Sequence, residues 1–537
     1  MPTDAPATAP QATAPPREGH SALLVGVGIF LSRIAGLVRT KAMGHYLGSN
    51  LAADAFNAAF RIPNLLQNLF GEGALSASFI PVYASLLAKG QSQEADRVAG
   101  AVGTLLGLVC AVLVAVGVFA APALVWALAP GFEGERAALT VHLVQLLFPG
   151  AALLVVSAWC LGILNSHRKF LLSYTAPVLW NAAMIAALLV FGASQAPRVL
   201  VDTLAIASVV GSFLQFGVQV PAVLRAAPGL RPGLRLAEPN VATVIRNFGP
   251  AFVGRGVMQI SSYVDSVIAS LLPVGSVSLF GYAQTLYTLP VSLFGMAVSA
   301  AELPAMSSAQ GTEAEVAAWL RDRLGRSLQR IAFFVIPSGI AFVLLGDTLA
   351  AAFFESGEFT HEDTVRVWAT LAGSSIGLLA QTWGRLYSST FYALKDARTP
   401  LRYAILRVAL TMSMGWVMAI ELPPLVGLDP KWGIAGLTAS AGMAGWVEYV
   451  LLKRALDRRV GVTGLPARTT ATLWAVGGLA GAIGVAAKLL APAVHPIFVA
   501  VLVVGPFGVT YLGVTWALGF TEASPILRRL GVRPRAR

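Results

Sequence analysis

Two consecutive segments, residues 21–42 (SALLVGVGIFLSRIAGLVRTKA) and 51–70 (LAADAFNAAFRIPNLLQNLF), decide the fold class of this chain. Each has about 20 mainly apolar residues, the length that an α-helix needs to cross a ~30 Å hydrocarbon core. Each also carries arginine: Arg33 and Arg39 in the first segment, Arg61 in the second. An arginine facing lipid at the bilayer centre costs at least ~3 kcal/mol, so we expect these side chains to face a water-filled interior. The pattern predicts membrane-spanning helices that each have one polar face.

The composition of the whole chain agrees with a membrane protein. Of 537 residues, 56% are hydrophobic and 12% are charged, and the mean hydropathy is +0.71. These charges are too few to cover the apolar surface of a soluble protein of this length. The net charge of +12 lies in short loops rather than in a basic domain, so no nucleic-acid partner is expected. Cys110 and Cys160 lie inside apolar segments and are interpreted as small buried residues.

Hydropathy predicts an all-α polytopic membrane protein with fourteen transmembrane helices. The predicted spans are residues 21–42, 51–70 with a second piece at 74–88, 98–120, 138–165, 172–194, 199–225, 241–272, 277–307, 328–346, 364–394, 400–420, 432–456, 469–490 and 496–519. A long basic connection after the sixth helix suggests two six-helix bundles around a central cationic cavity, a layout common in transporters. The predicted parts are a disordered tail (1–20), an N-lobe of helices 1–6 (21–228), a C-lobe of helices 7–12 (236–460), helices 13–14 (466–521) and a basic tail (522–537).

The loops predict the orientation in the membrane. Loops after even-numbered helices carry Lys and Arg, whereas the opposite loops are neutral or acidic, as in residues 355–363. Basic loops stay in the cytoplasm, so both termini are expected to be cytoplasmic, and an odd number of helices would break the alternation. Residues 1–20 contain no apolar core, so no cleavable signal peptide is expected.

The second helix carries a polar stripe. At 100° per residue, five of its side chains fall within roughly 80° of one another, with Pro63 expected to kink the helix. These side chains are Asp54, Asn57, Arg61, Asn64 and Asn68. A cavity wall explains the whole stripe. In the alternative, the helix dipole favours Asp54 in the first turn, the asparagines bond neighbouring helices, and Arg39 reaches the outer interface with Lys41.

Helices seven and eight offer a second polar face. Arg255, Gln259, Ser262 and Ser266 share one side of helix seven, with Asp265 on its flank, and helix eight presents Thr285, Thr288 and Ser292. Two faces of this kind imply a cavity for an anionic, polar ligand, and the planar fork of arginine suits phosphate. The sequence has no nucleotide-binding loop, and its histidines lack metal-ligand spacing. We therefore expect no enzymatic activity and no metal site.

Several motifs in these helices resemble the MurJ (MviN) family of lipid II flippases, within the multidrug/oligosaccharidyl-lipid/polysaccharide (MOP) exporter superfamily. The resemblance runs from about residue 21 to 460. It rests on residues 32–39 (SRIAGLVR), 54–56 (DAF), 60–66 (FRIPNLL), 71–74 (GEGA), 79–82 (FIPV), 129–132 (APGF), 176–177 (AP) with Asn181, 357–360 (GEFT), 391–393 (FYA) with Asp396, and 398–400 (RTP).

The resemblance implies alternating access that carries an undecaprenyl-pyrophosphate-linked sugar-peptide from the cytoplasmic to the outer leaflet of the bacterial cytoplasmic membrane. Arg33, Arg39 and Asp54 match cavity positions of the family. The expected partners are this lipid-linked glycan pyrophosphate and membrane lipids, with cell-wall synthesis enzymes as further candidates; nothing requires more than a monomer. No cofactor is expected, and the membrane potential or Na⁺ are candidate driving forces.

Some positions depart from the family pattern. Gln67 and Asn68 stand where basic residues are usual, and Gln284-Thr285 replaces an Asp-Arg pair. We hypothesise that Arg255 returns the cation lost at position 285. Asp265 matches an acid that is linked to bound sodium in some members, but helix eleven offers no clear acidic partner, and pairing with Arg255 is equally consistent.

These departures keep three other functions open. The first is a flippase for another polyprenyl-linked oligosaccharide. A cation-coupled drug antiporter would require acids in the cavity, which is expected to be basic. A non-transporting membrane scaffold is the third.

Overall fold

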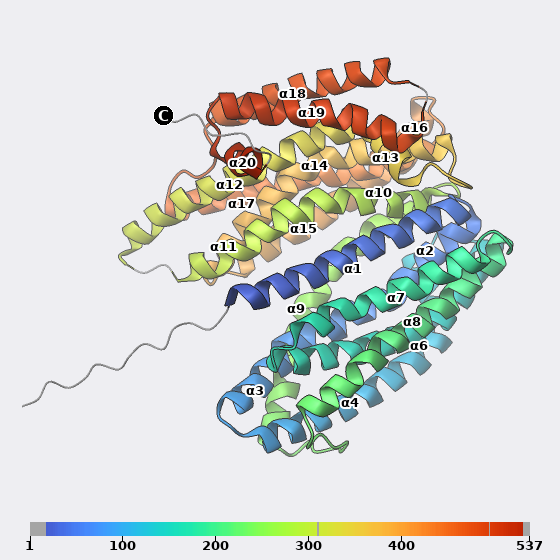
Figure 1. Ribbon diagram of the computed structural model, residues 1–537, viewed down its shortest axis with the longest axis vertical. Helices are drawn as coiled ribbons and strands as arrows, with labels where there is room; N and C mark the ends of the chain where they lie inside the picture. Colours follow the sequence, from blue (N-terminus) through green and yellow to red (C-terminus); the bar gives the residue numbers. More distant parts are fainter. Residues whose placement is uncertain (1–17, 309–310, 493, 530–537) are drawn as a thin grey trace, which may run out of the picture.

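The structure is a computed structural model that describes residues 18–308, 311–492 and 494–529. Within these ranges, the side chains of residues 18–26, 72, 73, 251, 253–262, 300, 304, 526 and 529 lie outside the description. The described chain is helical throughout (Figure 1), and within it no β-strand occurs, only an isolated bridge between Ser356 and Phe359.

The first half of the chain forms an N-terminal group of helices, drawn in blue to green in Figure 1. Its elements are α1 (Glu18–Leu47), α2 (Leu51–Leu66), η1 (Gln67–Leu75), α3 (Ser76–Ala88), α4 (Ser92–Phe119), α5 (Ala121–Leu128), α6 (Gly134–Ser166), α7 (Phe170–Phe191) and α8 (Pro197–Ala226). Helix α6 lies at the centre of the group and contacts α2, α4, α7 and α8, while α1 packs along α7.

Helix α9 (Pro239–Ser270) joins this group to the rest of the molecule. It contacts η1, α3 and α4 on one side and α10, α15 and α17 on the other. Phe70 of η1 packs against Phe252 of α9 with ring centroids 4.9 Å apart, and the Tyr263 hydroxyl donates to the Arg61 carbonyl at 2.9 Å. These contacts make α9 a shared wall between the two halves.

The second half forms a C-terminal group, drawn in yellow to orange. Its elements are α10 (Ser276–Pro290), η2 (Val291–Met296), α11 (Ala297–Ser307), α12 (Glu313–Leu344), α13 (Gly346–Phe354), α14 (His361–Ala393), α15 (Arg398–Trp416), η3 (Val417–Glu421), α16 (Leu422–Leu425), η4 (Pro430–Trp432) and α17 (Gly433–Val460). Helices α14 and α17 cross so closely that a Cβ added to Gly377 would lie 2.4 Å from the Gly442 Cα. Small residues of this kind let helix backbones touch inside a membrane.

The last helices lie on the outside of the C-terminal group, at the top of Figure 1. Helices α18 (Ala467–Leu490) and α19 (Pro496–Ala517) form a hairpin, followed by η5 (Thr521–Ala523) and α20 (Ser524–Arg529). The hairpin packs on α12 and α13.

Two π-helical segments interrupt long helices just after a proline. Segment η1 follows Pro63, and η2 follows Pro290. Because proline has no N–H to donate, the helix loses one backbone hydrogen bond there, and the chain can change its hydrogen-bond spacing. The kink expected at Pro63 therefore takes the form of a π-helical segment that reorients the residues after it.

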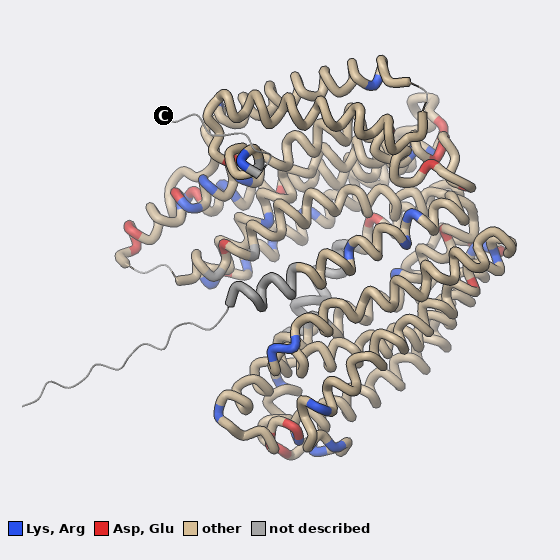
Figure 2. Tube along the Cα trace, in the orientation of Figure 1, with Lys and Arg blue, Asp and Glu red and all other residues tan. Residues whose placement is uncertain are grey.

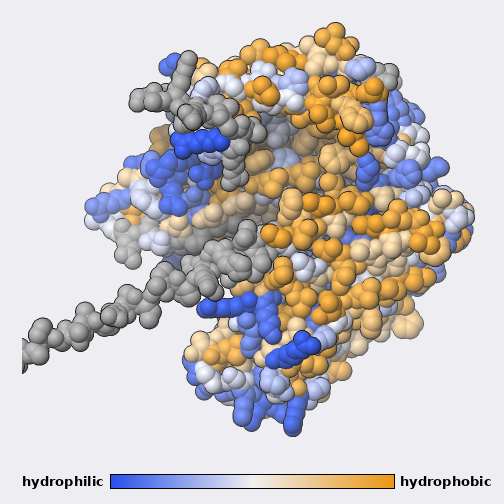
Figure 3. Space-filling model, viewed as in Figure 1, coloured by the Kyte–Doolittle hydropathy of each residue, from blue (hydrophilic) through white to orange (hydrophobic). Residues whose placement is uncertain are grey.

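The surface and composition are those of a multi-pass membrane protein. Nine of the described helices or helix pairs are long and apolar enough to span a bilayer. The space-filling view shows a continuous apolar surface along the helices (Figure 3). Large apolar side chains are exposed to the surroundings of the protein, including Phe119, Trp126 and Phe213. Lys and Arg gather at the helix ends nearest the start of α1 (Figure 2).

Every predicted transmembrane segment coincides with helix, but three details of the prediction are wrong. Helix α12 starts at Glu313 rather than near residue 328, because a capping box of Thr312 and Glu315 begins the helix there. The first half of α12 contains the basic residues that the sequence predicts to lie in a loop between two transmembrane helices. The short helices α5 and α13 were not expected at all.

Candidate functional site

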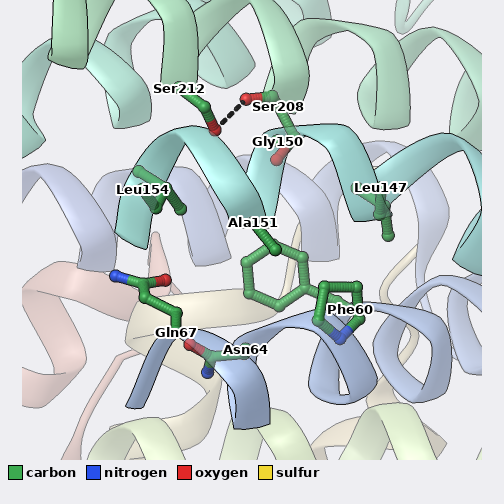
Figure 4. Close-up of a pocket in the computed structure, with 10 residues that line it drawn as sticks. Phe60, Asn64, Gln67, Leu147, Gly150, Ala151, Leu154, Ser208 and Ser212 are labelled. Atoms are coloured by element: carbon green, nitrogen blue, oxygen red, sulfur yellow. Dashed lines mark hydrogen bonds between the residues drawn. The ribbon is translucent and has the colours of Figure 1, made fainter. Parts of the chain in front are cut away.

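A polar cavity of about 340 Å³ lies inside the N-terminal group of helices. Residues from α1, α2, η1, α6, α7 and α8 line it: Ser32, Arg39, Phe60, Asn64, Gln67, Leu154, Ser157, Ala158, Leu161, Ser173, Pro177, Trp180, Asn181 and Gln215. Figure 4 shows an adjoining narrow pocket, in which Phe60, Asn64 and Gln67 lie opposite Ala151 and Leu154 of α6. We call the larger space the N-lobe cavity.

Among the described side chains, Arg39 is the only charged one in the wall of the N-lobe cavity. Its guanidinium carbon lies 4.6 Å from the centre of the Trp180 ring and 5.7 Å from that of Phe60. The aromatic faces stabilise the cation without neutralising it. The buried Nε atom of Arg39 has no hydrogen-bond partner in the described part of the chain. The side chain is therefore held in place while keeping donors for a ligand.

Arg39 also lines a second space, of about 100 Å³, between the two groups of helices. This second space contains Asn57 of α2 and Thr285 of α10. The Thr285 hydroxyl donates to the Gly281 carbonyl of its own helix at 3.0 Å. The structure thus brings Arg39 and Thr285 to one pocket, while their role in binding a ligand stays a prediction.

Arg33 bridges the two groups of helices. Its Nη1 atom donates to the Ser292 hydroxyl of η2 at 3.1 Å, and the side chain is otherwise exposed. Ser292 is one of the residues that the sequence placed on the polar face of helix eight.

Arg61 and Asn68 do not share a surface with Asn64. The Arg61 guanidinium faces α9 and α10, 5.2 Å from the Phe280 ring, in a small pocket with Tyr263 and Ser266. Asn68 is half-buried in η1. Asn68 leaves the predicted stripe because η1 changes the helical spacing after Leu66, whereas Arg61 lies in the regular part of α2, where its guanidinium faces α9 and α10.

The polar stripe of the second helix predicts that Asp54 lies in the wall of the cavity, but the structure places this residue in a buried contact between helices. Its carboxylate is fully buried and accepts from Arg136 of α6 at 2.6 Å, from the Gly275 amide at 2.7 Å and from the Ser278 amide at 2.8 Å. The amides belong to the first turn of α10, where a helix favours negative charge. Asp54 therefore ties α2 and α6 to the start of α10, and it lines neither of the spaces that Arg39 lines.

Asp54 belongs to a wider seam that closes one end of the molecule, which we call the outer seam. The Tyr282 hydroxyl donates to the Gly48 carbonyl at 3.0 Å, and the Glu358 amide donates to the His45 carbonyl at 2.8 Å. The Ser49 hydroxyl donates to Asp363. All these bonds join the end of α1 to the C-terminal group, at the end opposite the start of α1.

Asp265 lies among arginines rather than among other acids. Arg407 of α15 and Arg61 are the charged groups that act on its carboxylate, and Arg407 also pairs with Glu448 of α17 at 3.0 Å. Among the described residues, no group of three His, Cys, Asp or Glu side chains could hold a metal ion. Arginine side chains therefore act on Asp265 at the position that the family resemblance links to sodium, and its buried Oδ1 atom has no hydrogen-bond partner among the described residues.

The side chains of Arg255 and Gln259 lie outside the described residues, so their predicted place in the C-terminal wall stays a prediction. The backbone of both residues lies in α9.

The neutral polar residues of the N-lobe cavity were missed as a group. Ser157, Ser173 and Gln215 were not selected from the sequence, and Asn181 only appeared as part of a motif. One signal was available: Ser208, Ser212, Gln215 and Gln219 recur at helical spacing along the otherwise apolar α8.

The fold and the polar cavity define a polytopic α-helical transporter. A solved lipid II flippase MurJ, in an inward closed conformation, has the same fold with a TM-score of 0.75 at 21% identity, covering 95% of this chain and 100% of that chain. An inward-facing multidrug transporter of the MATE family, in the MOP superfamily, matches with a TM-score of 0.63 at 15% identity, covering 82% and 98%.

Sequence comparison is more specific. The family model described as lipid II flippase MurJ matches residues 43–509. The lipid II flippase MurJ of Burkholderia cenocepacia is 34% identical over 438 residues, which are 80% of this chain and 82% of that protein. The chain belongs to the MurJ family.

Proposed function

We propose that this protein is a lipid II flippase. It moves the undecaprenyl-pyrophosphate-linked sugar-peptide from the cytoplasmic to the outer leaflet of the bacterial cytoplasmic membrane, and it catalyses no reaction. Family membership supports this function, and one structural observation carries it: Arg39, a cation held over two aromatic rings, faces a polar cavity between apolar helices.

The pyrophosphate is bound by arginines of the cavity. Arg39 lies in the wall, and Arg33 lies two turns earlier on α1, with its guanidinium reaching η2. A guanidinium can donate two parallel hydrogen bonds to phosphate oxygens. Asn64 and Thr285 contribute neutral hydrogen-bonding groups around Arg39, in the two spaces that this side chain lines. The proposal includes Arg61, Asn68, Arg255 and Gln259 as further ligand contacts, because polar side chains within these apolar helices favour a polar path.

Fourteen helices cross the membrane, as two six-helix lobes and a final pair, with both termini in the cytoplasm. Nine of the fourteen spans are the apolar helices described above, and five further segments complete the number: α1, α2 to α3, α9, α14 and α17. Each of the five carries charged residues such as Arg33, Asp54, Asp265, Arg385 or Glu448, so each has a polar inner face that lowers its mean apolarity. The clusters of Lys and Arg at the ends nearest the start of α1 support a cytoplasmic N-terminus.

Transport then requires alternating access. With this orientation, the outer seam faces the periplasmic side and is closed, so the conformation described here receives substrate from the cytoplasmic leaflet. Release to the outer leaflet requires the Asp54, Tyr282 and Glu358 contacts of the seam to separate. The protein acts as a monomer, since each lobe contributes residues to the pocket shared by Arg39 and Thr285 within one chain.

A depletion experiment tests this function. A bacterium depleted of its own flippase should regain growth and outer-leaflet lipid II when it expresses this protein, and Arg39→Gln should fail to restore either. Arg198→Gln is the matched control, because Arg198 lies on the surface with two thirds of its side chain exposed. A protein that reaches the membrane without restoring lipid II would contradict the proposal, and restoration of a different polyprenyl-linked glycan would identify the alternative substrate.

A further inference from the structure

The N-lobe cavity contains more hydrogen-bonding capacity than a pyrophosphate needs. Besides Arg39, its polar lining is neutral: Ser32, Asn64, Gln67, Ser157, Ser173, Asn181 and Gln215. No carboxylate is among the lining residues. Amides and hydroxyls offer donors and acceptors together, whereas phosphate oxygens only accept. The lining therefore matches a neutral ligand with hydroxyl and amide groups.

Asn181 supplies an acceptor that has no partner among the residues that the structure describes. The residue is 4% exposed, and its Nδ2 atom donates to the Pro177 carbonyl at 3.0 Å. This bond turns Oδ1 away from its own helix, and the buried Oδ1 atom accepts no hydrogen bond. A buried acceptor without a partner costs about 1–3 kcal/mol, so the site favours a ligand that donates to it.

Ser157 of α6 supplies a donor in the lining of the same cavity. Its Oγ accepts from Gln215 Nε2 at 3.2 Å and from Gln219 Nε2 at 2.6 Å. With two donors already aimed at the oxygen, the hydroxyl proton is left to be donated. Ser157 and Gln215 are both more than nine-tenths buried, so α6 and α8 hold these groups in fixed positions.

The cavity lies beside the arginines of α1. A Cβ added to Gly36 would lie 3.9 Å from Asn181 Oδ1, and Gly36 stands between Arg33 and Arg39 on α1. A ligand whose phosphates contact these arginines would place the chemical group attached to the phosphates next to Asn181. The cavity of about 340 Å³ is within the usual range of small-ligand sites, about 300–1,000 Å³.

We infer that the N-lobe cavity is a carbohydrate subsite, in which Asn181 and Ser157 bind the hydroxyl and amide groups of the sugar joined directly to the pyrophosphate. This inference rests on the proposed function, because it takes the arginines of α1 as the phosphate site. It makes Asn181 and Ser157 specificity-determining residues, which distinguish a sugar-bearing lipid from the same lipid without sugar.

Binding to two lipids tests the subsite. The full-length protein in nanodiscs is titrated with lipid II and with undecaprenyl pyrophosphate, which has the same anionic group and tail but no sugar. Removal of one neutral hydrogen bond weakens binding about threefold to tenfold. Asn181→Leu should weaken lipid II binding by that factor and leave undecaprenyl pyrophosphate binding unchanged. Arg39→Gln should weaken both.

Two further variants control for structural effects. Asn165→Leu makes the same substitution at another asparagine, which lies outside the cavity lining and whose buried Oδ1 also lacks a partner among the described residues. This variant should bind lipid II and undecaprenyl pyrophosphate with unchanged affinity. Ser157→Ala is a small change that should give the same selective loss as Asn181→Leu, even if the latter folds poorly.

Four outcomes are distinguishable. Selective loss of lipid II binding supports the subsite. The subsite is overturned if both variants, Asn181→Leu and Ser157→Ala, lose affinity equally for the two lipids. It is also overturned if both variants keep their affinity for the two lipids. Either result leaves the flippase function intact. Wild-type protein that binds neither lipid overturns the proposed function and the subsite together.

Discussion

At the scale of single residues, the environment of each charge decides its role more than the charge itself does. Arg39 and Asp54 both lie on polar faces of neighbouring helices. Arg39 is held by aromatic rings that leave its donors available, whereas three donors occupy the Asp54 carboxylate. The first arrangement suits ligand binding and the second suits a structural contact that opens and closes.

Replacement of Arg39 by lysine should separate the effect of geometry from that of charge. Lysine keeps the cation but loses the planar fork and its stacking on Trp180. We expect Arg39→Lys to lower lipid II affinity about tenfold and Arg39→Gln to lower it about 10- to 100-fold, since hydrogen bonds to charged groups contribute about 1.5–3 kcal/mol. Titration of purified protein measures both. Equal affinity of wild type and Arg39→Gln would contradict this role.

Asp54 should contribute mainly to stability. Asp54→Ala leaves the buried Arg136 guanidinium and two α10 amides without their acceptor, and breaking such a pair costs about 3–5 kcal/mol. Thermal unfolding in detergent should show a clear decrease in Tm. The double variant Asp54→Leu/Arg136→Met should regain part of the lost stability, because it removes the unpaired Arg136 charge while the Gly275 and Ser278 amides still lack their acceptor. A single variant as stable as wild type would contradict the assignment.

Sequence reasoning located some of these residues and misplaced others for physical reasons. Arg39 and Asn64 were selected because polar groups in an apolar helix need a wet surface, and the structure places both at the N-lobe cavity. Asp54 was assigned to the same wall because helical periodicity predicts which side of a helix a residue lies on. It does not predict which residue of another helix that side chain will contact. Asn181 and Gln215 were overlooked because neutral polar residues are common inside membrane helices, where they bond neighbouring helices, and so give a weaker signal than charged residues do.

At the scale of elements, the ends and interruptions of helices determine where the two halves meet. Gly48 ends α1 with φ of +57°, and a Cβ there would lie 2.4 Å from the Glu358 carbonyl oxygen. Only glycine allows this backbone conformation and this close approach together. The outer seam therefore depends on an exact fit between one turn and the loop before α14.

Gly48→Ala should loosen the outer seam. Ser356→Cys, added at the seam, should react faster with a membrane-impermeant maleimide in the Gly48→Ala background, because the clash separates the two loops. The native Cys110 and Cys160 are buried and should contribute little background. Gly90→Ala is the matched control: its φ is +74°, but no atom lies within 4 Å of the added Cβ. Equal labelling in both backgrounds would contradict the closed seam.

Helix positions followed from the sequence more reliably than helix boundaries did. All predicted segments are helical because runs of apolar residues mark them strongly. The start of α12 was missed because a capping box and charged pairs, including Asp322 with Arg326 at 2.7 Å, stabilise a helix outside the apolar run. A hydropathy profile does not detect a helical segment that is rich in charged residues.

At the scale of the whole molecule, the distribution of charge predicts how transport depends on ions. Asp265 is balanced by Arg407 and Arg61, and Arg407 pairs with Glu448. Transport should therefore be the same in sodium and in choline buffers of equal ionic strength at a fixed membrane potential. Proteoliposomes allow both conditions to be set. A tenfold or larger decrease without sodium would show that a cation site exists that these contacts do not reveal.

The central claim is that a cationic cavity within this fold carries lipid II across the membrane, and transport by purified protein tests it most directly. Proteoliposomes containing fluorescent lipid II in both leaflets are treated with a membrane-impermeant quencher, and the fraction that becomes accessible over time reports flipping. The account predicts rapid flipping by the wild-type protein and by Arg198→Gln, and a loss of at least tenfold for Arg39→Gln. Flipping that proceeds unchanged in Arg39→Gln, or no flipping by the wild-type protein, would contradict it.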